Sequence, residues 1–215
     1  MGSALAPVPL LVLAPEGGGP GALIEIYPGV TAPAGPSAEA GRLLLRLAAS
    51  DARAFQALAW MPAGRPRRDA VSFRRWRTYV GPPRPLTDSD ASLTVREWLH
   101  LASVLWGVPT AAWAAAELQR WGLGAVARRR LGSLSPGLQQ QVRLAASLVP
   151  HPHCWILDDP AGHLDHDARL RLESIVAGRA AGWCPSAVVV APGAPLTLPD
   201  GHATLKWADG AWQRE

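Results

Sequence analysis

The chain has 215 residues, of which 48% are hydrophobic, enough to bury the core of one α/β domain. Its formal net charge of +4 is a mild basic excess that does not select among an acidic protein, nucleic acid and lipid headgroups. The first twenty residues lack a basic start, and their apolar run is short and rich in proline, which argues against a signal peptide or a membrane span. Cys154 and Cys184 have no metal-ligand spacing and are expected to be reduced and largely buried.

The first third of the chain changes from strand-like to helical character. Two apolar runs, PLLVLA and ALIEIY, are separated by the turn-forming EGGGPG and predict short strands within residues 1–34. From Ser37 onward, AGRLLLRLAAS places leucines around most of a helix and predicts a buried one. Residues 61–90 mix strand-like pieces with arginine clusters and proline turns, and we expect them to form exposed connections.

Helices are predicted through the middle of the chain. The segment from Leu93 to about Arg130 is helical in character, with Thr94 as a plausible N-cap. Its apolar part from 101 to 118 contains glycine, proline and glutamate, which favours a core or interface helix over a membrane span. A second helix should begin at Ser135 or Pro136, because proline is tolerated in a first turn, and run to Leu148.

The last third alternates strands and a helix. CWILDD is a short apolar run that ends in two carboxylates, as expected of a central parallel strand. A helix from Asp167 to Ala177 and a second buried strand, SAVVVA, follow. This βαβ order predicts an α/β fold with a parallel sheet.

Residues 134–165, LSPGLQQQVRLAASLVPHPHCWILDDPAGHLD, carry the strongest motif. They resemble, without a gap, the signature, helix, Walker B and D-loop of ATP-binding subunits of ABC transporters. Leu134, Ser135 and Gly137 match the LSGGQ signature, while Pro136 and Leu138 depart from it.

The Walker B and D-loop positions follow in the same register. Asp158 matches the Walker B aspartate, and Asp159 stands where the family has its catalytic glutamate. Pro160 follows as in the family, and Leu164 and Asp165 match the D-loop. The resemblance implies a RecA-like P-loop NTPase core with a β-rich N-terminal part, a small helical lobe at about 90–150, and a single nucleotide-binding-like domain over 1–215.

The same register aligns GPSAEAGRLLLRLAAS with Walker A and the helix after it. A working phosphate loop wraps phosphates in backbone N–H groups and needs glycines where the backbone approaches them. Gly35, Pro36 and Ser37 survive, whereas Ala38 and Ala40 replace glycines. The phosphate cradle is therefore expected to be impaired, although the helix N-terminus remains a weak anion site.

The two charged functions of Walker A are also missing. Gly41 stands at the lysine position, and Arg42 replaces the hydroxyl that holds Mg²⁺. Lys206 is the sole lysine in the chain, so no register can supply a phosphate-loop lysine. Asp158 and Asp159 are then expected to persist as strand-end acids that pair locally or cap amides.

Two further family residues have no counterpart. The Q-loop glutamine is absent, because residues 57–118 contain no glutamine and Pro82 takes its place. The switch histidine should follow the strand after the D-loop, where the sequence offers Pro192 or Gly193 and no histidine before His202. The resemblance thus predicts a pseudo-ATPase on its own, with no tightly bound cofactor and with ATP and Mg²⁺ at most at an interface with a partner subunit.

In the family, such subunits work as head-to-tail dimers on a membrane subunit. This implies a heterodimer with an active ABC ATPase subunit, a membrane transporter subunit as second partner, and a place at the inner face of the cell membrane reached through partners. The short length and the run WILDDP resemble the haem-exporter subunit of cytochrome c maturation. A free-standing regulatory or scaffold protein on the same fold is the alternative; an intact ATPase is disfavoured by the single lysine.

Two other kinds of site have candidate residues in the sequence. A metal site would need several ligand-type side chains to converge; the candidates are His151, His153, His163, Asp165, His166 and Asp167. Arginines around two aromatic residues could follow a nucleic-acid backbone; they are Arg65, Arg67, Arg68, Arg74, Arg75 and Arg77, around Phe73 and Trp76. A solvated loop and an arginine-rich surface are the commoner explanations, so neither metal nor nucleic acid is expected.

Overall fold

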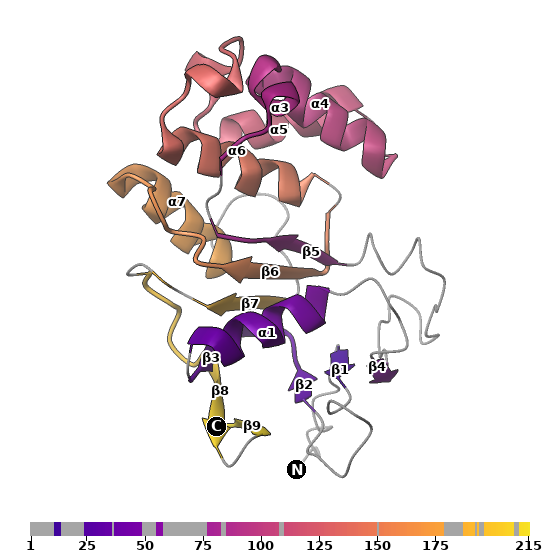
Figure 1. The fold of residues 1–215 in the computed structure, drawn as a ribbon, viewed down its shortest axis with the longest axis vertical. Coiled ribbons are helices and arrows are strands. Elements are labelled where there is room, and N and C mark those ends of the chain that lie inside the picture. The colour runs from indigo at the N-terminus through magenta and orange to yellow at the C-terminus, as the bar shows by residue number, and fades with distance from the viewer. Residues whose placement is uncertain are drawn as a thin grey trace, which may run out of the picture.

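The structure is a computed structural model (Figure 1) that describes residues 11–13, 24–35, 37–48, 55–57, 77–82, 85–107, 110–149, 151–178, 187–191, 193, 196–208 and 211–215. The strands are β1 (Leu11–Leu13), β2 (Ile24–Ile26), β3 (Gly29–Ala34), β4 (Phe55–Ala57), β5 (Arg77–Val80), β6 (Cys154–Asp158), β7 (Ala187–Ala191), β8 (Ala203–Ala208) and β9 (Ala211–Arg214). The helices are α1 (Ser37–Ala48), α3 (Asp88–Ser92), α4 (Val95–Trp106), α5 (Thr110–Arg120), α6 (Pro136–Leu148) and α7 (His166–Val176), with short 3-10 turns at Gly124–Val126 and Leu131–Ser133.

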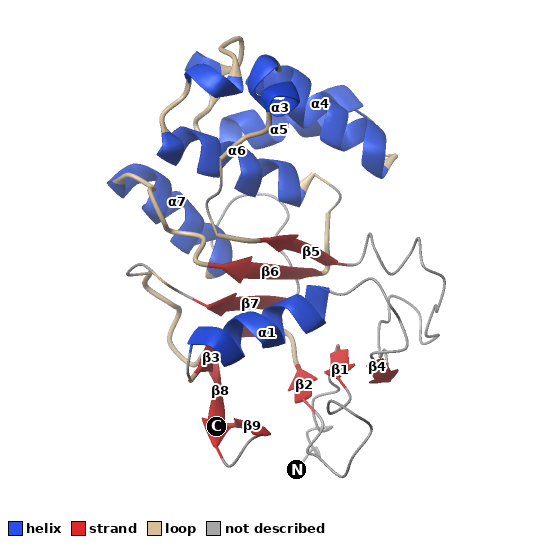
Figure 2. Cartoon of the chain, in the orientation of Figure 1, coloured by secondary structure: helices blue, strands red, loops and turns tan. Residues whose placement is uncertain are grey.

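Six strands form the main sheet in the order β5-β6-β7-β3-β8-β9. All neighbours run parallel except β8 and β9, which form an antiparallel pair at one edge. The first two predicted strands, β1 and β2, belong to a separate small sheet, in which β1 lies in the middle and pairs antiparallel with β2 on one side and with β4 on the other (Figure 2). The predicted α/β class and the β-rich N-terminal part are both confirmed.

Helices cover both faces of the sheet. Successive side chains of a strand point to opposite faces, and β6 accordingly divides between two cores. Cys154 and Ile156 pack with α1, whereas Trp155 and Leu157 pack with α4, α6 and α7. All four are fully buried, which explains why the strand reads as an unbroken apolar run.

The helices α3 to α6 make up the helical lobe, at the top of Figure 1. Thr94 caps α4 as predicted, because its hydroxyl accepts from the amide of Glu97 at 3.2 Å and the Glu97 carboxylate accepts from the Thr94 amide at 2.8 Å. Gly107 ends this helix in the left-handed conformation. Within the described part of the chain, no helix is both long and apolar enough to cross a bilayer.

The expectation that residues 61–90 are exposed connections is wrong for 77–80; residues 61–76, 83 and 84 lie outside the described parts. Residues 77–80 form β5, the edge strand of the main sheet, and Arg77 is 5% exposed. Its Nε donates to the Leu47 carbonyl at 2.7 Å and its Nη2 to the Ala48 carbonyl at 3.2 Å. A guanidinium can be buried here because the last carbonyls of α1 lack partners within that helix.

Candidate functional site

The carboxyl ends of β3, β5, β6 and β7 meet at one edge of the sheet, where open α/β folds bind ligands. At this edge the structure gathers Gly35, Tyr79, Asp158, Asp159 and Gly193. Four of these positions were predicted from sequence, and Tyr79 was not. Tyr79 lies in β5, which ends at this edge. The alternation of side chains along that strand is the sequence signal that could have identified it.

The predicted Walker A segment forms helix where a phosphate loop would need irregular backbone. Strand β3 ends at Ala34 and α1 begins at Ser37; Pro36 lies outside the described residues. From Gly41 onward the amides belong to the α-helical hydrogen-bonding pattern and are not free to wrap a phosphate. Gly35 has a packing role, since a Cβ there would lie 2.8 Å from the Cβ of Trp207.

The lysine and hydroxyl positions of Walker A have different surroundings. A Cβ on Gly41 would meet no heavy atom within 4 Å. Arg42 is exposed, and its Nη2 lies 3.3 Å from Oε1 of Glu39 one turn earlier. Neither residue is directed to the Walker B carboxylates by any contact that the structure shows.

Lys206 lies closer to this region than its place in the sequence suggested. Strand β8 pairs with β3, and Lys206 is opposite Ala34 in the register. Its neighbours Leu205 and Trp207 pack toward α1, so alternation directs Lys206 to the opposite face of the sheet. There its Nζ lies 2.9 Å from Oε1 of Glu215.

Asp158, at the predicted Walker B position, accepts a hydrogen bond from a side chain of β5. The Tyr79 hydroxyl donates to Oδ2 of Asp158 at 3.3 Å. Burial raises the pKa of Asp158, the hydrogen bond from Tyr79 opposes this rise, and the charge of Asp159 adds to it. A phenol therefore contacts the carboxylate at the predicted Walker B position.

Gly193, one of the two positions predicted for the switch histidine, lies against the side chain of Asp159. A Cβ on Gly193 would lie 2.5 Å from Cγ of Asp159; Pro192 lies outside the described residues. Asp159 itself has a positive φ of 45°, and its amide donates to the Ala191 carbonyl at 2.8 Å. His202 precedes β8 and therefore lies at the amino-terminal edge of the parallel strands, away from this site.

The position predicted for the Q-loop glutamine lies two residues after β5. Pro82 is exposed and is separated from the end of that strand by Gly81. Proline offers neither an amide donor nor a polar side chain here.

The segments predicted to be the signature and the D-loop contact each other at the start of α6. Ser135 is the N-cap, and its hydroxyl accepts from the Leu138 amide at 3.3 Å. A Cβ on Gly137 would overlap the carbonyl oxygen of His163. Asp165 is the N-cap of α7, and its Oδ1 accepts from the Ala168 amide at 2.8 Å.

Leu134 and Leu164 are both buried and belong to the same apolar cluster. Every described match to the signature or D-loop therefore has a local structural task as well as its position in the motif.

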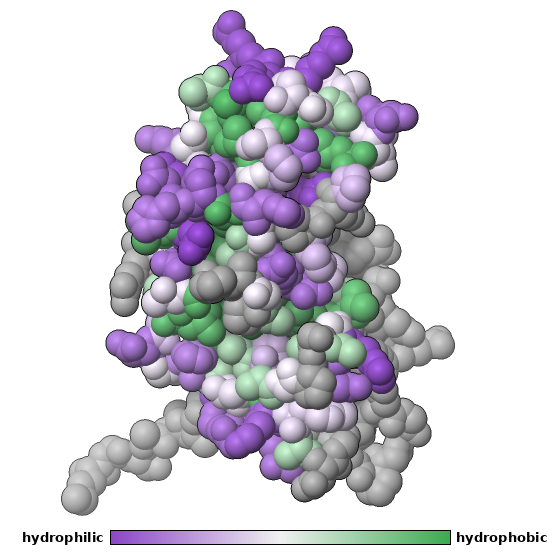
Figure 3. Space-filling view, turned by 60° about the vertical axis from the view of Figure 1, so that its left-hand side comes forward, coloured by the Kyte–Doolittle hydropathy of each residue, from purple (hydrophilic) through white to green (hydrophobic). Residues whose placement is uncertain are grey.

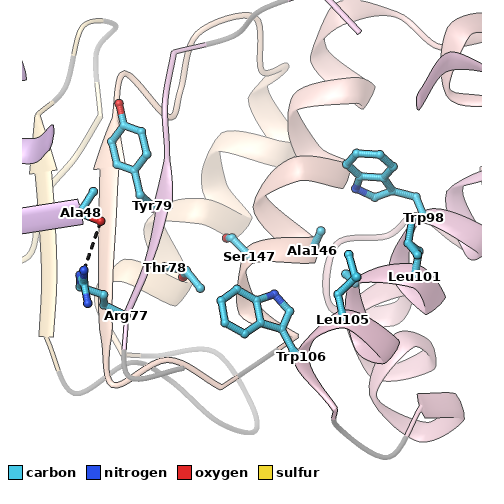
Figure 4. Close-up of a pocket in the computed structure, with 11 residues that line it drawn as sticks. Ala48, Arg77, Thr78, Tyr79, Trp98, Leu101, Leu105, Trp106, Ala146 and Ser147 are labelled. Carbon is cyan, nitrogen blue, oxygen red and sulfur yellow. Dashed lines mark hydrogen bonds between the residues drawn. The ribbon is translucent and has the colours of Figure 1, made fainter. Parts of the chain in front are cut away.

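A separate cavity of about 430 Å³ lies between β5, the end of α1, α4 and α6 (Figure 4). Thr78 and Trp98 are among its lining residues, and Thr78 Oγ1 and Trp98 Nε1 are buried atoms without a hydrogen-bond partner among the described residues. A buried polar atom left unpaired costs roughly 1–3 kcal/mol. Trp98 lies within the helical lobe predicted at about 90–150, but nothing in the sequence indicates that its indole N–H lacks a partner.

Large apolar side chains are exposed on α4. They are Leu101, Val104 and Leu105, the last 75% exposed. The face that carries α7 is by contrast largely hydrophilic at the height of that helix (Figure 3). The exposed apolar row on α4 is therefore a candidate contact surface.

The metal and nucleic-acid alternatives receive no support from the geometry. Within the described ranges, no three His, Cys, Asp or Glu residues lie close enough to hold a metal ion. Arg77 is buried and bonded to α1, so it is not on a nucleic-acid-binding surface. The other five arginines of that cluster lie outside the described residues.

Comparisons with known proteins agree with the fold. No protein-family profile matches the chain. It is 31% identical over 194 residues to the cytochrome c biogenesis ATP-binding export protein CcmA of Mesorhizobium japonicum, covering 88% of this chain and 80% of that protein.

Other matches are shorter or more distant. The chain is 49% identical over 55 residues to the Fe(3+) ions import ATP-binding protein FbpC of Streptomyces coelicolor, where the match spans 16% of that protein. Among solved structures, it is similar to cbiO1 from Clostridium perfringens, part of the ABC transporter complex cbiONQ. That similarity has a TM-score of 0.67 and 17% identity over 96% of this chain and 88% of the other, and shows a shared fold.

Proposed function

This chain belongs to the family of ATP-binding subunits of ABC transporters, and we propose that it is a member that does not turn over ATP on its own. The observation that carries the proposal is the helix at the Walker A position. Residues 37–42 are the first turns of α1, with Gly41 at the lysine position. A helix lacks the loop of converging amides, and Gly41 lacks the cation, on which phosphate binding depends.

Three further features support the proposal. Tyr79 bonds to Asp158, Pro82 replaces the Q-loop glutamine, and Gly193 leaves no space for a switch histidine beside Asp159. Each affects a different step: holding the metal, sensing it, and stabilising the reacting phosphate. A single compensating residue would not restore all three.

The direct test is steady-state ATP hydrolysis by the purified chain, compared with Asp158→Ala and Asp159→Ala. We expect all three proteins to show the same background rate, and no saturable binding of Mg²⁺-ATP. Hydrolysis by the unmodified chain that is lost in either variant would contradict the proposal. The two variants control for a contaminating ATPase, which would be unaffected by them.

We further propose that the chain pairs with an active ABC ATPase subunit and docks on a membrane subunit. In this arrangement Ser135, Gly137 and Asp165 face the nucleotide that the active subunit holds. The exposed apolar row on α4 offers the surface for the membrane subunit, which would keep the chain at the inner face of the cell membrane. The CcmA relative favours a transporter of the cytochrome c maturation type.

The pairing is tested by the ATPase activity of the reconstituted complex carrying Ser135→Arg. Ser135 is exposed, so arginine fits the free chain but would collide with a nucleotide across the interface. Because the change also removes the N-cap of α6, Ser135→Ala is the matched control, with an expected loss of stability of about 1 kcal/mol. Activity that falls with arginine and not with alanine supports donation; equal activity in all assembled complexes excludes it.

A scaffold on the same fold is the second candidate, and one observation favours it. Ser135 and Asp165 act as helix caps, and Gly137 avoids the His163 carbonyl, so none of the three needs a nucleotide to explain it. Purification from native cells separates the candidates. Co-purification of an ABC ATPase and a membrane protein favours the transporter subunit, and their absence favours the scaffold.

A further inference from the structure

We propose that a turn of three consecutive arginines in the helical lobe binds the anionic headgroups of a lipid bilayer directly. This arginine turn consists of Arg128, Arg129 and Arg130, all exposed, and lies between the 3-10 turns Gly124–Val126 and Leu131–Ser133. Figure 1 shows the segment that contains it, coloured salmon, at the end of the lobe away from the sheet. Strongly hydrophilic side chains project at that end of the molecule (Figure 3).

The backbone of the arginine turn is fixed by hydrogen bonds. The Val95 amide, at the start of α4, donates to the Arg129 carbonyl at 3.1 Å, and the Leu131 amide donates to the Leu93 carbonyl at 2.8 Å. Within the turn, the Arg129 amide donates to the Val126 carbonyl at 2.9 Å. A turn held in this way does not have to be ordered on binding, which removes part of the entropic cost of association.

The charge of the arginine turn is available to an external anion. Within the described ranges, no carboxylate forms an ion pair with its guanidinium groups. Arg129 Nη2 donates to the Ser133 carbonyl at 2.6 Å, which leaves the positive charge in place. Glu97 is the nearby acid: its pKa is lowered first by hydrogen bonds from Thr94 and to a smaller extent by the charge of Arg130.

The surrounding charges leave a small positive excess. Arg96 is exposed at the start of α4, and its amide donates to the Ala127 carbonyl beside the turn at 2.9 Å, so it adds a fourth cation. Besides Glu97, the acidic side chains at this end of the lobe are Asp88 and Asp90 in the first turn of α3. Four arginines therefore face three carboxylates, and the three arginines of the turn are consecutive.

The composition of the segment favours a headgroup layer over a protein or a nucleic acid. From 124 to 133 the exposed residues are glycine, alanine, serine and arginine. The core of a protein–protein interface depends on aromatic or aliphatic anchors, which these residues do not provide. Trp121, which precedes the segment, is fully buried and offers no surface on which bases could stack. A headgroup layer needs only exposed cations, each of which strengthens binding roughly fivefold.

The test measures co-sedimentation of the purified full chain with lipid vesicles. One set of vesicles is pure phosphatidylcholine, and the other contains phosphatidylcholine and the anionic phosphatidylglycerol. We expect binding to the anionic vesicles alone at about 0.1 M salt, and its loss at about 1 M salt, where charges are screened over about 3 Å. No partner subunit and no ATP are present, so the outcome is separate from those of the hydrolysis and pairing tests.

Variants assign the binding to the arginine turn. Changing Arg128, Arg129 and Arg130 together to glutamine should weaken binding tenfold or more, whereas changing them to lysine should keep it within about twofold, because the charge remains. The matched control changes Arg65, Arg67 and Arg68 to glutamine, which lowers the net charge by the same amount. These three lie outside the described residues, and we expect this control to weaken binding less than threefold.

Glu97→Gln tests the same charge in the opposite direction. Glutamine can replace glutamate in the capping box of α4, so the helix start is preserved while one negative charge beside Arg130 is removed. Binding to the anionic vesicles should become up to about fivefold tighter. Unchanged or weaker binding in a folded Glu97→Gln variant would contradict the proposal.

Four other results would overturn it. They are absence of binding to the anionic vesicles, equal weakening by the two glutamine triple variants, binding that persists on pure phosphatidylcholine, and binding of a duplex DNA without binding of vesicles. Circular dichroism shows whether each variant is folded. If the triple variant of the turn is not, Arg128→Gln with Arg130→Gln replaces it, since that pair leaves the bond from Arg129 to the Ser133 carbonyl intact.

Discussion

The carbonyl oxygen of His163 occupies the space that a side chain on residue 137 would need. The signature helix and the D-loop are thereby held against each other through one glycine. We expect Gly137→Ala to lower the free energy of unfolding by about 1–3 kcal/mol, the usual cost of forcing an extra group into a packed contact. Chemical denaturation measures this, and an unchanged midpoint would show that the loop moves aside without cost.

Gly41 is the matched control, because it lies in a helix and has open space beside it. Alanine there should raise the free energy of unfolding by about 0.5–1 kcal/mol, since glycine in a helix is conformationally costly. The same denaturation experiment serves. Destabilisation by Gly41→Ala would mean that residues 37–42 are not helical, which would also remove the main support for the pseudo-ATPase proposal.

Restoring two family residues should not restore activity. The double change Gly41→Lys with Arg42→Ser supplies a lysine and a hydroxyl but leaves the helical backbone, Pro82 and Gly193 as they are. We expect ATP hydrolysis to remain at the background of the unmodified chain. Hydrolysis that appears with these two changes and disappears on adding Asp158→Ala would show that the remaining differences do not matter.

Arg77 should be essential for the end of α1. Removing it by Arg77→Ala leaves the Leu47 and Ala48 carbonyls without their guanidinium donors, at a cost of about 2 kcal/mol or more. Arg96→Ala, at an exposed position of α4, should stay within about 0.5 kcal/mol of the unmodified chain. Equal effects of the two changes in thermal or chemical unfolding would argue against the capping role.

The stability of the chain should carry a pH dependence from Asp158. Burial raises the pKa of this carboxyl, so the folded state binds its proton more tightly than the unfolded state does. Asp158 therefore contributes most to the free energy of unfolding below the ordinary carboxyl pKa of about 4. This contribution is lost as the pH rises through the raised pKa of the folded state. Asp158→Asn should be the more stable protein at pH 7, with the difference shrinking toward pH 4.

Tyr79→Phe provides the control for that titration. The hydrogen bond from Tyr79 favours the charged carboxylate, so removing it should raise the pKa of Asp158 further and enlarge the loss of stability between pH 4 and pH 7. An unchanged pH dependence in Tyr79→Phe would show that the hydroxyl does not act on Asp158.

The sequence by itself determined the elements whose signals are local. Thr94 with Glu97 defines the start of α4, Ser135 with Pro136 that of α6, and the apolar run ending at Asp158 defines β6. These depend on capping groups and on side-chain period within a few residues, which a single sequence displays directly. The alignment of residues 134–165 with the family motifs was based on local signals of the same kind.

Tertiary structure alone decided the contacts between segments far apart in the chain. Arg77 was misplaced on the surface because its partners, the carbonyls at the end of α1, lie about thirty residues away and leave no trace in its own segment. Lys206 is distant from Gly35 in sequence, yet β8 pairs with β3 and its alternation determines which face the lysine occupies. Whether a larger residue could replace Gly137 or Gly193 depends on backbone and carboxylate atoms that folding brings near them. The space that such atoms occupy has no signal in the local sequence.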